Sequence, residues 1–418
     1  MRIAQFSYSS TVGGASRAVR KLHDALVASG HDGRLLVADR SGNDYTDSPV
    51  SALQAAWDTA LAYADGGLSL LQRPADRALR GVATFPTPLE RRLTKERPDV
   101  VNMHWVGLGT ASVAQLGRIM ATHPTVWSLH DMWAMSGAEF YGEDASTIRR
   151  NTGYTRANRP PGDTGVDIDR WVWQRKTRHF TTPAHIVTAS RWMAGLVGDA
   201  ELTRSWPVSV IPYSIDLDLF APADNQVSRQ AVGLTADDNV VLFGANKGPA
   251  DPRKGWDLLV EALGRLWAEG QRFHLVVFGN PDKSQESQVP FPIKWLGNIG
   301  SDQQLADTYR LADLIAIPSR ADNLPLTGLE SQACGIPVVA FDTAGMPDVA
   351  VHRETGYLAQ PFDTVDLAQG MSWILSDDGV RATLSSAART RAEKLWRRST
   401  IAAQYLEVYQ QALAAHRR

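Results

Sequence analysis

Two acidic side chains flank a predicted helix start in the second half of the chain. Asp322 follows the apolar run DLIAIPS, and seven residues separate it from Glu330 on a short helix that ends near Gly335. Free backbone N–H groups at a helix start suit oxygen-rich or anionic ligands, and a carboxylate beside them can hold two sugar hydroxyls. The alternative is that Asp322 only caps the helix and that Glu330 is a solvated helix residue.

Three cations form a second candidate group, in the run GANKGPADPRKGW over residues 244–256. Lys247, Arg253 and Lys254 follow a predicted strand and lead into a helix. Arg can bind phosphate oxygens in a bidentate way, and Lys acts as a point charge, so this cluster favours a diphosphate. A solvated basic turn that caps the helix is the alternative, and it would suit Arg253.

The first half of the chain offers two weaker groups. Gly13 and Gly14 follow the first predicted strand, where glycine allows close backbone approach, and Ser16 precedes a helix start. The chain contains neither G-x-G-x-x-G here nor G-x-x-x-x-G-K-[ST] anywhere, so dinucleotide and P-loop interpretations lose their main support. His130 ends another strand in WSLHDMW, and Asp131 either orients it or caps the following turn.

Near-continuous apolar strands alternate with helical patterns along the chain, which predicts parallel sheets covered on both faces. We therefore expect an α/β protein with two doubly wound, Rossmann-like domains that face each other across a cleft, where ligands sit outside the carboxyl ends of the strands. The predicted domains are residues 1–215 and 216–399, joined by a linker near 213–225. The predicted strands are residues 1–6, 34–38, 100–104, 126–130, 185–189, 240–244, 273–279, 293–296, 313–317 and 337–341.

Composition excludes several classes of protein. The 418 residues include 43 Lys plus Arg and 45 Asp plus Glu, a net charge of −2, which argues against a wholesale basic nucleic-acid binder. The single cysteine, Cys334, excludes a disulfide scaffold and cysteine-built metal sites, and its expected burial argues against a nucleophilic role. No signal peptide or long apolar span is visible, so a cytoplasmic protein is expected.

Two regions depart from the strand and helix pattern. Residues 134–170 are polar and aperiodic and predict a long loop, either ordered beside the cleft or mobile. Between residues 71 and 97, seven cations outnumber three acidic residues. This Arg73–Arg97 region is either a surface for anionic lipid, on the inner face of a membrane, or a solvated face.

The chain resembles the retaining glycosyltransferases of family 4, which have the GT-B fold. Their signature is an acidic residue, seven residues and then Glu, followed by A-x-G-x-P-V-V-A; here these are Asp322, Glu330 and ACGIPVVA. The family usually has Glu at the first position. The LHDMW string resembles a subgroup of the colanic-acid type that builds bacterial surface polysaccharides. The WVWQRK segment at 171–176 also matches that subgroup, but the cysteines that it carries between the two motifs are absent here.

The resemblance implies a role for each candidate residue. Glu330 would hold the ribose, and Lys254 with Lys247, or alternatively Arg253, would hold the diphosphate. Asp322 and the N–H groups of Asn323 and Leu324 would hold the sugar. By the same resemblance, Gly13 and Gly14 face the donor phosphates and the acceptor, His130 approaches the donor sugar, and a C-terminal helix over 400–418 packs back on the first domain. The implied catalytic residues are His130, Lys254 and Asp322.

The implied activity is retaining sugar transfer from a UDP- or GDP-sugar to a glycan or lipid-linked saccharide. No cofactor or metal is expected, because no D-x-D motif lies at a suitable strand end, and no nucleic acid is expected as a partner. The alternatives are a GT-B nucleotide-sugar epimerase and a catalytically silent nucleotide-sugar-binding protein.

Overall fold

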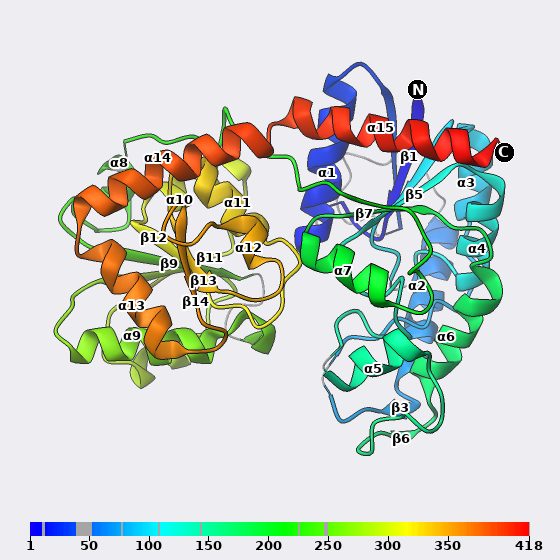
Figure 1. Cartoon of the computed structure of the whole chain (residues 1–418), viewed down its shortest axis with the longest axis horizontal. Helices are drawn as coiled ribbons and strands as arrows, with labels where there is room; N and C mark the ends of the chain where they lie inside the picture. Colours follow the sequence, from blue (N-terminus) through cyan, green and yellow to red (C-terminus); the bar gives the residue numbers. More distant parts are fainter. Residues whose placement is uncertain are drawn as a thin grey trace. The chain divides into compact units, whose positions relative to one another are not determined.

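The computed structural model describes residues 1–10, 13–38, 52–76, 78–107, 109–142, 144–224, 226–245 and 250–417. The chain divides into two compact units, each built around its own parallel sheet (Figure 1). Unit 1 comprises Met1–Pro212 and Ile401–Arg418, and unit 2 comprises Tyr213–Thr400. The prediction of two doubly wound α/β domains is confirmed.

The sheet of unit 1 has six parallel strands in the order β2-β1-β4-β5-β7-β8. The first connection adds β2 on one side of β1, and the following connections add β4 and the later strands on the other side. The strand order therefore reverses between β1 and β4. In open α/β sheets, ligands bind outside the carboxyl ends of the strands at such a reversal. The strands are β1 (Arg2–Ser7), β2 (Asp32–Val37), β4 (Val100–Met103), β5 (Thr125–Leu129), β7 (His185–Thr188) and β8 (Val208–Val210).

Helices cover both faces of this sheet. On one face α15 packs with α1 against the strands, where Ile401, Tyr405 and Tyr409 meet Ile3 and other buried residues. The Asn102 amide donates to the Tyr409 hydroxyl over 2.8 Å and so anchors α15 to β4. The helices of unit 1 are α1 (Gly13–Ala28), α2 (Ala52–Ser69), α3 (Leu89–Glu96), α4 (Val113–Thr122), α5 (Asp144–Thr152), α6 (Ile168–His179) and α7 (Arg191–Asp199), and α15 (Arg398–His416) starts in unit 2.

The sheet of unit 2 repeats this plan, with six parallel strands in the order β11-β10-β9-β12-β13-β14. Its reversal lies between β9 and β12. Except for the half-buried edge strand β11, the strands are nearly continuous buried apolar runs, as a sheet covered on both faces requires. They are β9 (Val240–Ala245), β10 (His274–Gly279), β11 (Ile293–Gly297), β12 (Leu314–Ile317), β13 (Val338–Phe341) and β14 (Gly356–Ala359).

Two groups of helices enclose the second sheet: α9 and α13 pack together on one side, and α10, α11 and α14 lie on the other (Figure 1). The elements are α8 (Gln226–Ala231), the 3-10 turn η3 (Pro252–Lys254), α9 (Trp256–Ala268), the 3-10 helix η4 (Lys283–Gln288), α10 (Asp302–Arg310), α11 (Leu326–Ala333), α12 (Met346–Val349), α13 (Thr364–Leu375) and α14 (Asp378–Leu395).

The expected loop over residues 134–170 contains regular structure, which corrects that prediction. Helix α5 occupies Asp144–Thr152, and β6 (Thr164–Gly165) pairs antiparallel with β3 (Gln72–Arg73). Arg149 and Arg150, at the end of α5, are almost fully buried. The apolar periodicity expected of a helix is missing in α5 because its buried positions include these two arginines.

The expected linker over residues 213–225 is also corrected, because the structure integrates most of it into unit 2. Phe220 is fully buried, and its ring lies 6.2 Å from that of Tyr309 on α10. Arg389 on α14 donates to the carbonyls of Leu217 and Phe220. The segment was predicted as a linker between the domains, but its carbonyl groups accept hydrogen bonds from a helix far along the chain.

Only part of the cationic stretch over residues 71–97 lies at the surface of the molecule. Arg80 is 8% exposed and forms ion pairs with Asp76 and Asp169, so it does not contribute to a basic face. Arg77 lies outside the described residues. In the described part of the chain, no helix is both long enough and apolar enough to span a bilayer.

Candidate functional site

The predicted site residues lie at the strand-order reversal in unit 2, and at the reversal or one strand beyond it in unit 1. In unit 2, Lys254 follows β9, and Asp322 follows the adjacent β12. In unit 1, Gly13 follows β1 at the reversal, whereas His130 follows β5, one strand beyond β4. The carboxyl ends of neighbouring parallel strands meet at one edge of a sheet, so residues 68 or more positions apart in sequence become neighbours.

Lys254 and Asp322 form an ion pair between the Lys Nζ and Asp Oδ2 atoms. Their side chains are 25% and 14% exposed, so a ligand can still reach them. Gly255 makes this approach feasible: its φ is +67°, and a Cβ there would lie 2.0 Å from the Pro318 carbonyl oxygen. The Arg320 N–H also donates to the Arg253 carbonyl over 2.7 Å and joins the two loops.

The other predicted cations have different environments. The Arg253 guanidinium donates to Asp251 over 2.9 Å, and its side chain is 40% exposed. Arg320, which no sequence argument singled out as a cation, forms a two-bond ion pair with Asp257. The prediction for Lys247 falls on residues 246–249, outside the described part of the chain.

The backbone after Asp322 is held tightly. Asn323 and Leu324 are 2% and 3% exposed, and α11 begins two residues later without a side-chain cap. Asp322 therefore does not cap this helix. The Gly345 N–H donates to the Asp322 carbonyl over 3.0 Å, and a Cβ on Gly345 would lie 1.5 Å from the Asn323 oxygen. Only glycine fits there, although the sequence analysis did not single out Gly345.

Glu330 is fully buried on α11, which excludes the alternative of a solvated helix residue. The Tyr309 hydroxyl, on α10, donates to its Oε2 atom over 2.9 Å. A buried carboxylate without partners would be costly, so this tyrosine is part of the reason why the acid is tolerated. The sequence analysis missed Tyr309, because nothing in the pattern of α10 distinguishes it from a core aromatic residue. Cys334 is buried as expected, and burial raises its thiol pKa to about 12.

The paired glycines of unit 1 begin α1 directly. The helix starts at Gly13, so Ser16 lies in its first turn and not before it, which corrects the predicted start. Gly13 has a φ of +87°, a backbone conformation that favours glycine. Among the described residues, no atom lies within 4 Å of where a Cβ on Gly13 or Gly14 would be, so the backbone at this helix start is open to close approach.

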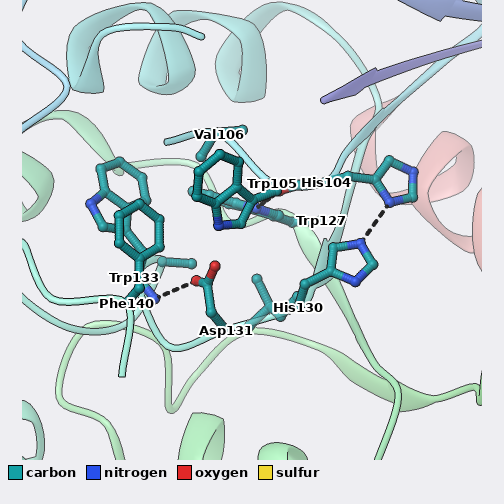
Figure 2. A pocket seen from close by; sticks show the side chains of 10 residues that line it. His104, Trp105, Val106, Trp127, His130, Asp131, Trp133 and Phe140 are labelled. Atoms are coloured by element: carbon teal, nitrogen blue, oxygen red, sulfur yellow. Dashed lines mark hydrogen bonds between the residues drawn. The ribbon is translucent and has the colours of Figure 1, made fainter. Parts of the chain in front are cut away.

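His130 follows β5 and belongs to a chain of buried and half-buried polar groups. The Nε2 atom of His130 lies 3.2 Å from Nδ1 of His104, and the two rings are stacked (Figure 2). Nε2 of His104 lies 3.3 Å from Nε2 of Gln5, whose Oε1 atom lies 3.2 Å from Nδ1 of His23. Burial lowers the pKa of His130 to about 4 and holds that of His104 well below its ordinary value. Sequence analysis found only His130 of these four.

Asp131 caps the turn that follows His130. Its Oδ1 atom accepts a hydrogen bond from the Trp133 N–H over 2.8 Å (Figure 2). Aromatic side chains, including Trp105 and Phe140, enclose a small pocket beside it, whose volume of about 10 Å³ is close to the minimum for one water molecule. This pocket is thus a packing feature and too small for a sugar.

Lys176, the last residue of the WVWQRK segment, holds the loop after His130. Its buried Nζ atom donates to the carbonyls of Trp133, Ser136 and Gly137. The Tyr141 hydroxyl donates to the His130 carbonyl over 3.0 Å and closes the loop from its other end. Nothing in the tryptophan-rich sequence around Lys176 indicated this structural role.

In the described part of the chain, no group of three or more His, Cys, Asp or Glu side chains could hold a metal ion.

Two family models match successive parts of the chain. The model described as Glycosyltransferase Family 4 matches residues 12–219, and the one described as Glycosyl transferases group 1 matches residues 224–391. The D-inositol 3-phosphate glycosyltransferase of Saccharomonospora viridis is 34% identical over 50% of this chain and 51% of that protein. That of Mycolicibacterium smegmatis is 31% identical over 50% and 49%. The chain spans about half the length of the curated relatives it matches.

Solved structures with low sequence identity share the fold. Sucrose-phosphate synthase from Thermosynechococcus elongatus superposes with a TM-score of 0.69 at 19% identity, covering 99% of both chains. Anabaena Alr3699/HepE, solved with UDP and glucose, gives a TM-score of 0.64 at 17% identity, covering 98% of this chain and all of that one. These likenesses establish the GT-B fold. With family models matching both halves, the chain belongs to the family 4 glycosyltransferases.

Proposed function

We propose that this chain transfers a sugar from a nucleoside diphosphate sugar, linked to UDP or GDP, to an acceptor hydroxyl. One observation carries the proposal: an accessible ammonium, Lys254, and an accessible carboxylate, Asp322, meet at the reversal of unit 2 beside the start of α11. A phosphate oxygen suits the first group, and sugar hydroxyls suit the second. Family membership and the UDP bound to the Anabaena neighbour support the same ligand class.

Each predicted residue receives a role in this proposal. Lys254 meets the diphosphate, assisted by Arg253 or Lys247. Glu330 accepts the ribose hydroxyls through its carboxylate, which Tyr309 holds in place. Asp322 and the N–H groups of Asn323 and Leu324 bind the sugar. The open backbone at Gly13 and Gly14 approaches the donor phosphates and the acceptor, and His130 approaches the donor sugar.

The proposed mechanism needs no nucleophile from the protein. Lys254 and nearby N–H groups stabilise the negative charge that develops on the departing diphosphate, which is the main catalytic effect available. The acceptor oxygen attacks the anomeric carbon from the face that the diphosphate leaves, and its proton passes to the leaving phosphate oxygen. The anomeric configuration is retained, and no metal ion is required.

For the acceptor we propose a glycan or a lipid-linked saccharide of surface-polysaccharide synthesis. The curated relatives are named D-inositol 3-phosphate glycosyltransferases, so a phosphorylated polyol is a second class of acceptor to test. A lipid-linked acceptor would fit a protein in the cytoplasm that contacts the inner face of the membrane. Leu70, Leu71 and Leu79 are 78%, 52% and 56% exposed near the cationic Arg73, which supports such contact.

The test is an assay of the purified full chain with a panel of nucleotide sugars. Each donor is incubated with saccharide, lipid-linked and inositol phosphate acceptors, with and without excess chelator. We expect one donor to be consumed only with an acceptor, in chelator as well as without it. Proton NMR of the product should show the anomeric coupling of the donor, and an inverted anomer would contradict the mechanism.

Two outcomes would favour the alternatives. A changed donor sugar without any acceptor would indicate an epimerase. Donor binding, detected by thermal shift, without turnover on any acceptor would indicate a silent nucleotide-sugar-binding protein. Liposomes that contain anionic lipid should bind the chain, and a variant with Leu70, Leu71 and Arg73 replaced by Ser should bind less; equal binding would refute the membrane contact.

A further inference from the structure

We propose that Gln5 and His104 are positioning residues that fix His130 as the tautomer with its proton on Nδ1. The assignment follows from the direction of the hydrogen bonds that link Gln5, His104 and His130 within unit 1. Its consequence for catalysis rests on the proposed function, but the tautomer itself does not.

The three residues come from neighbouring strands, which sets their order. Gln5 lies on β1, His104 follows β4, and His130 follows β5, and these strands are adjacent in the sheet. Gln5 is fully buried, and His104 is 3% exposed. Because the strands lie side by side at fixed spacing, each side chain meets the next one at hydrogen-bonding distance.

The Gln5 amide gives the chain a direction, because its oxygen only accepts and its nitrogen only donates. Its Oε1 atom lies 3.2 Å from Nδ1 of His23, so His23 donates at that atom. Its Nε2 atom lies 3.3 Å from Nε2 of His104, so that ring nitrogen accepts. The glutamine between the two histidines therefore accepts a hydrogen bond from His23 on one side and donates one to His104 on the other.

The remaining assignments follow from the chemistry of a neutral imidazole, in which one nitrogen donates and the other accepts. His104 accepts at Nε2, so its proton is on Nδ1, and it donates to Nε2 of His130 over 3.2 Å (Figure 2). His130 thus accepts at Nε2 and carries its proton on Nδ1. Burial keeps both rings neutral, since it lowers the pKa of each.

The catalytic consequence is that any group at Nδ1 of His130 is offered a hydrogen. Under the proposed function, a sugar or phosphate oxygen that reaches this atom would find a donor oriented before binding, so no reorganisation is needed. The opposite tautomer would offer a lone pair, which repels a phosphate oxygen and can only accept a hydrogen bond from a sugar hydroxyl. Fixing a histidine tautomer through its second nitrogen is a general way of setting its function.

The test is a long-range proton–nitrogen NMR spectrum of the full chain labelled with ¹⁵N-histidine, recorded near pH 7 without ligand. Single histidine variants assign the signals. We expect His104 and His130 each to show a protonated Nδ1 and an unprotonated Nε2. A protonated Nε2 on His130, or a doubly protonated ring, would overturn the proposal whatever the protein catalyses.

The variant Gln5→Met tests the cause, because Met has a similar shape but no amide. We expect both histidines to become mixtures of tautomers and kcat to fall by up to about 10²-fold, the scale of one lost donor. Gln115→Leu is the matched control, since Gln115 is buried in unit 1 and bonds Ser112, Thr87 and Glu90 but no histidine. It should leave the tautomers unchanged.

An unchanged His130 tautomer in folded Gln5→Met would show that Gln5 does not set it. If Gln5→Met does not fold, His23→Leu removes the group that orients the amide, and the same mixture of tautomers is expected. A pure Nδ1–H signal in His23→Leu would also refute the role of the amide. An inactive wild-type protein with the expected spectrum would refute the proposed function alone.

Discussion

The Lys254–Asp322 pair of unit 2 and the His104–His130 pair of unit 1 are organised in opposite ways. The first consists of charged side chains that keep 25% and 14% of their surface exposed. The second consists of two imidazole rings, of which His104 is 3% exposed and His130 is half-buried, and burial lowers the pKa of both. Unit 2 thus presents charged groups at its sheet edge, whereas unit 1 presents neutral groups that are joined by hydrogen bonds.

The supports of the two pairs differ as well. Backbone contacts that require glycine, at Gly255 and Gly345, hold the loops of unit 2. Buried side chains hold the loop of unit 1, with Lys176 bound to three carbonyls and Tyr154 donating to Glu139. Substitutions of site residues in unit 2 should therefore reduce turnover, and those in the network of unit 1 should reduce stability first.

Lys176→Met should have the largest effect, on stability. It leaves three buried carbonyls without a donor, each at a cost of about 1–3 kcal/mol, so we expect a loss of about 3–5 kcal/mol. Urea unfolding followed by circular dichroism measures it. Lys394→Met, on the surface of α14, is the control. Equal stability of the two variants would contradict the role given to Lys176.

Lys254→Met should instead reduce turnover by about 10²–10³-fold, the scale of one lost preorganised group, with little change in unfolding. A partly exposed ion pair contributes at most about 1 kcal/mol to stability. Arg265→Met breaks the exposed Arg265–Glu261 pair on α9 and should leave both quantities unchanged. Normal turnover in Lys254→Met would transfer the diphosphate role to Arg253 or Lys247.

Acid should destabilise unit 1 through its neutral histidines. The unfolded chain protonates histidine below about pH 6.5, whereas folded His130 stays neutral down to about pH 4, and the pKa of His104 is also lowered. The contribution of these two rings to the free energy of unfolding is therefore fully present above about pH 6.5. It is lost as the pH falls toward 4, at about 1.4 kcal/mol per pH unit for each ring.

Urea unfolding at pH 7, 6 and 5 measures this slope. His130→Gln should make it shallower by about one histidine, whereas His416→Gln, at the exposed end of α15, should not change it. Parallel pH dependence in wild type and His130→Gln would show that the folded protein protonates this ring as readily as the unfolded chain does.

Tyr309→Phe should have the smallest effect, on nucleotide affinity. It removes the 2.9 Å hydrogen bond to Glu330 and leaves the carboxylate less well oriented. We expect binding to weaken by about 1 kcal/mol, close to the average for one hydrogen bond. Titration calorimetry with UDP and GDP measures it, and stronger binding in the variant would contradict a supporting role for Tyr309.

The sequence predicted the two doubly wound units, and it placed Lys254 and Asp322 each after a strand of the second unit, because both predictions follow local patterns. It did not predict that the two side chains pair. Continuous apolar runs indicate buried parallel strands, and a fixed spacing places Asp322 and Glu330 around a helix start. Asp131 caps a turn. The local sequence had left two roles open for this residue, a cap of the turn and the orientation of His130.

The partners of these residues could not be predicted, because they come from distant parts of the chain. Gln5 and His104 lie 99 positions apart, and nothing in either strand marks its side chain as part of a chain of histidines. Lys176 and its carbonyl partners are about 40 positions apart. The helix α5 escaped prediction because buried arginines break the apolar periodicity on which such predictions depend.

Whether unit 2 holds the donor nucleotide can be decided by titrating UDP and GDP into wild type, Glu330→Gln and Glu261→Gln in a calorimeter. Glu330 is buried beside the reversal of the sheet, and Glu261 is an exposed acid on α9. Wild type and Glu261→Gln should bind one of the two nucleotides with equal affinity. Glu330→Gln should bind it about 1–3 kcal/mol more weakly, the range for hydrogen bonds to a charged group. Unchanged affinity in a folded Glu330→Gln variant would contradict the assignment of the ribose to this carboxylate.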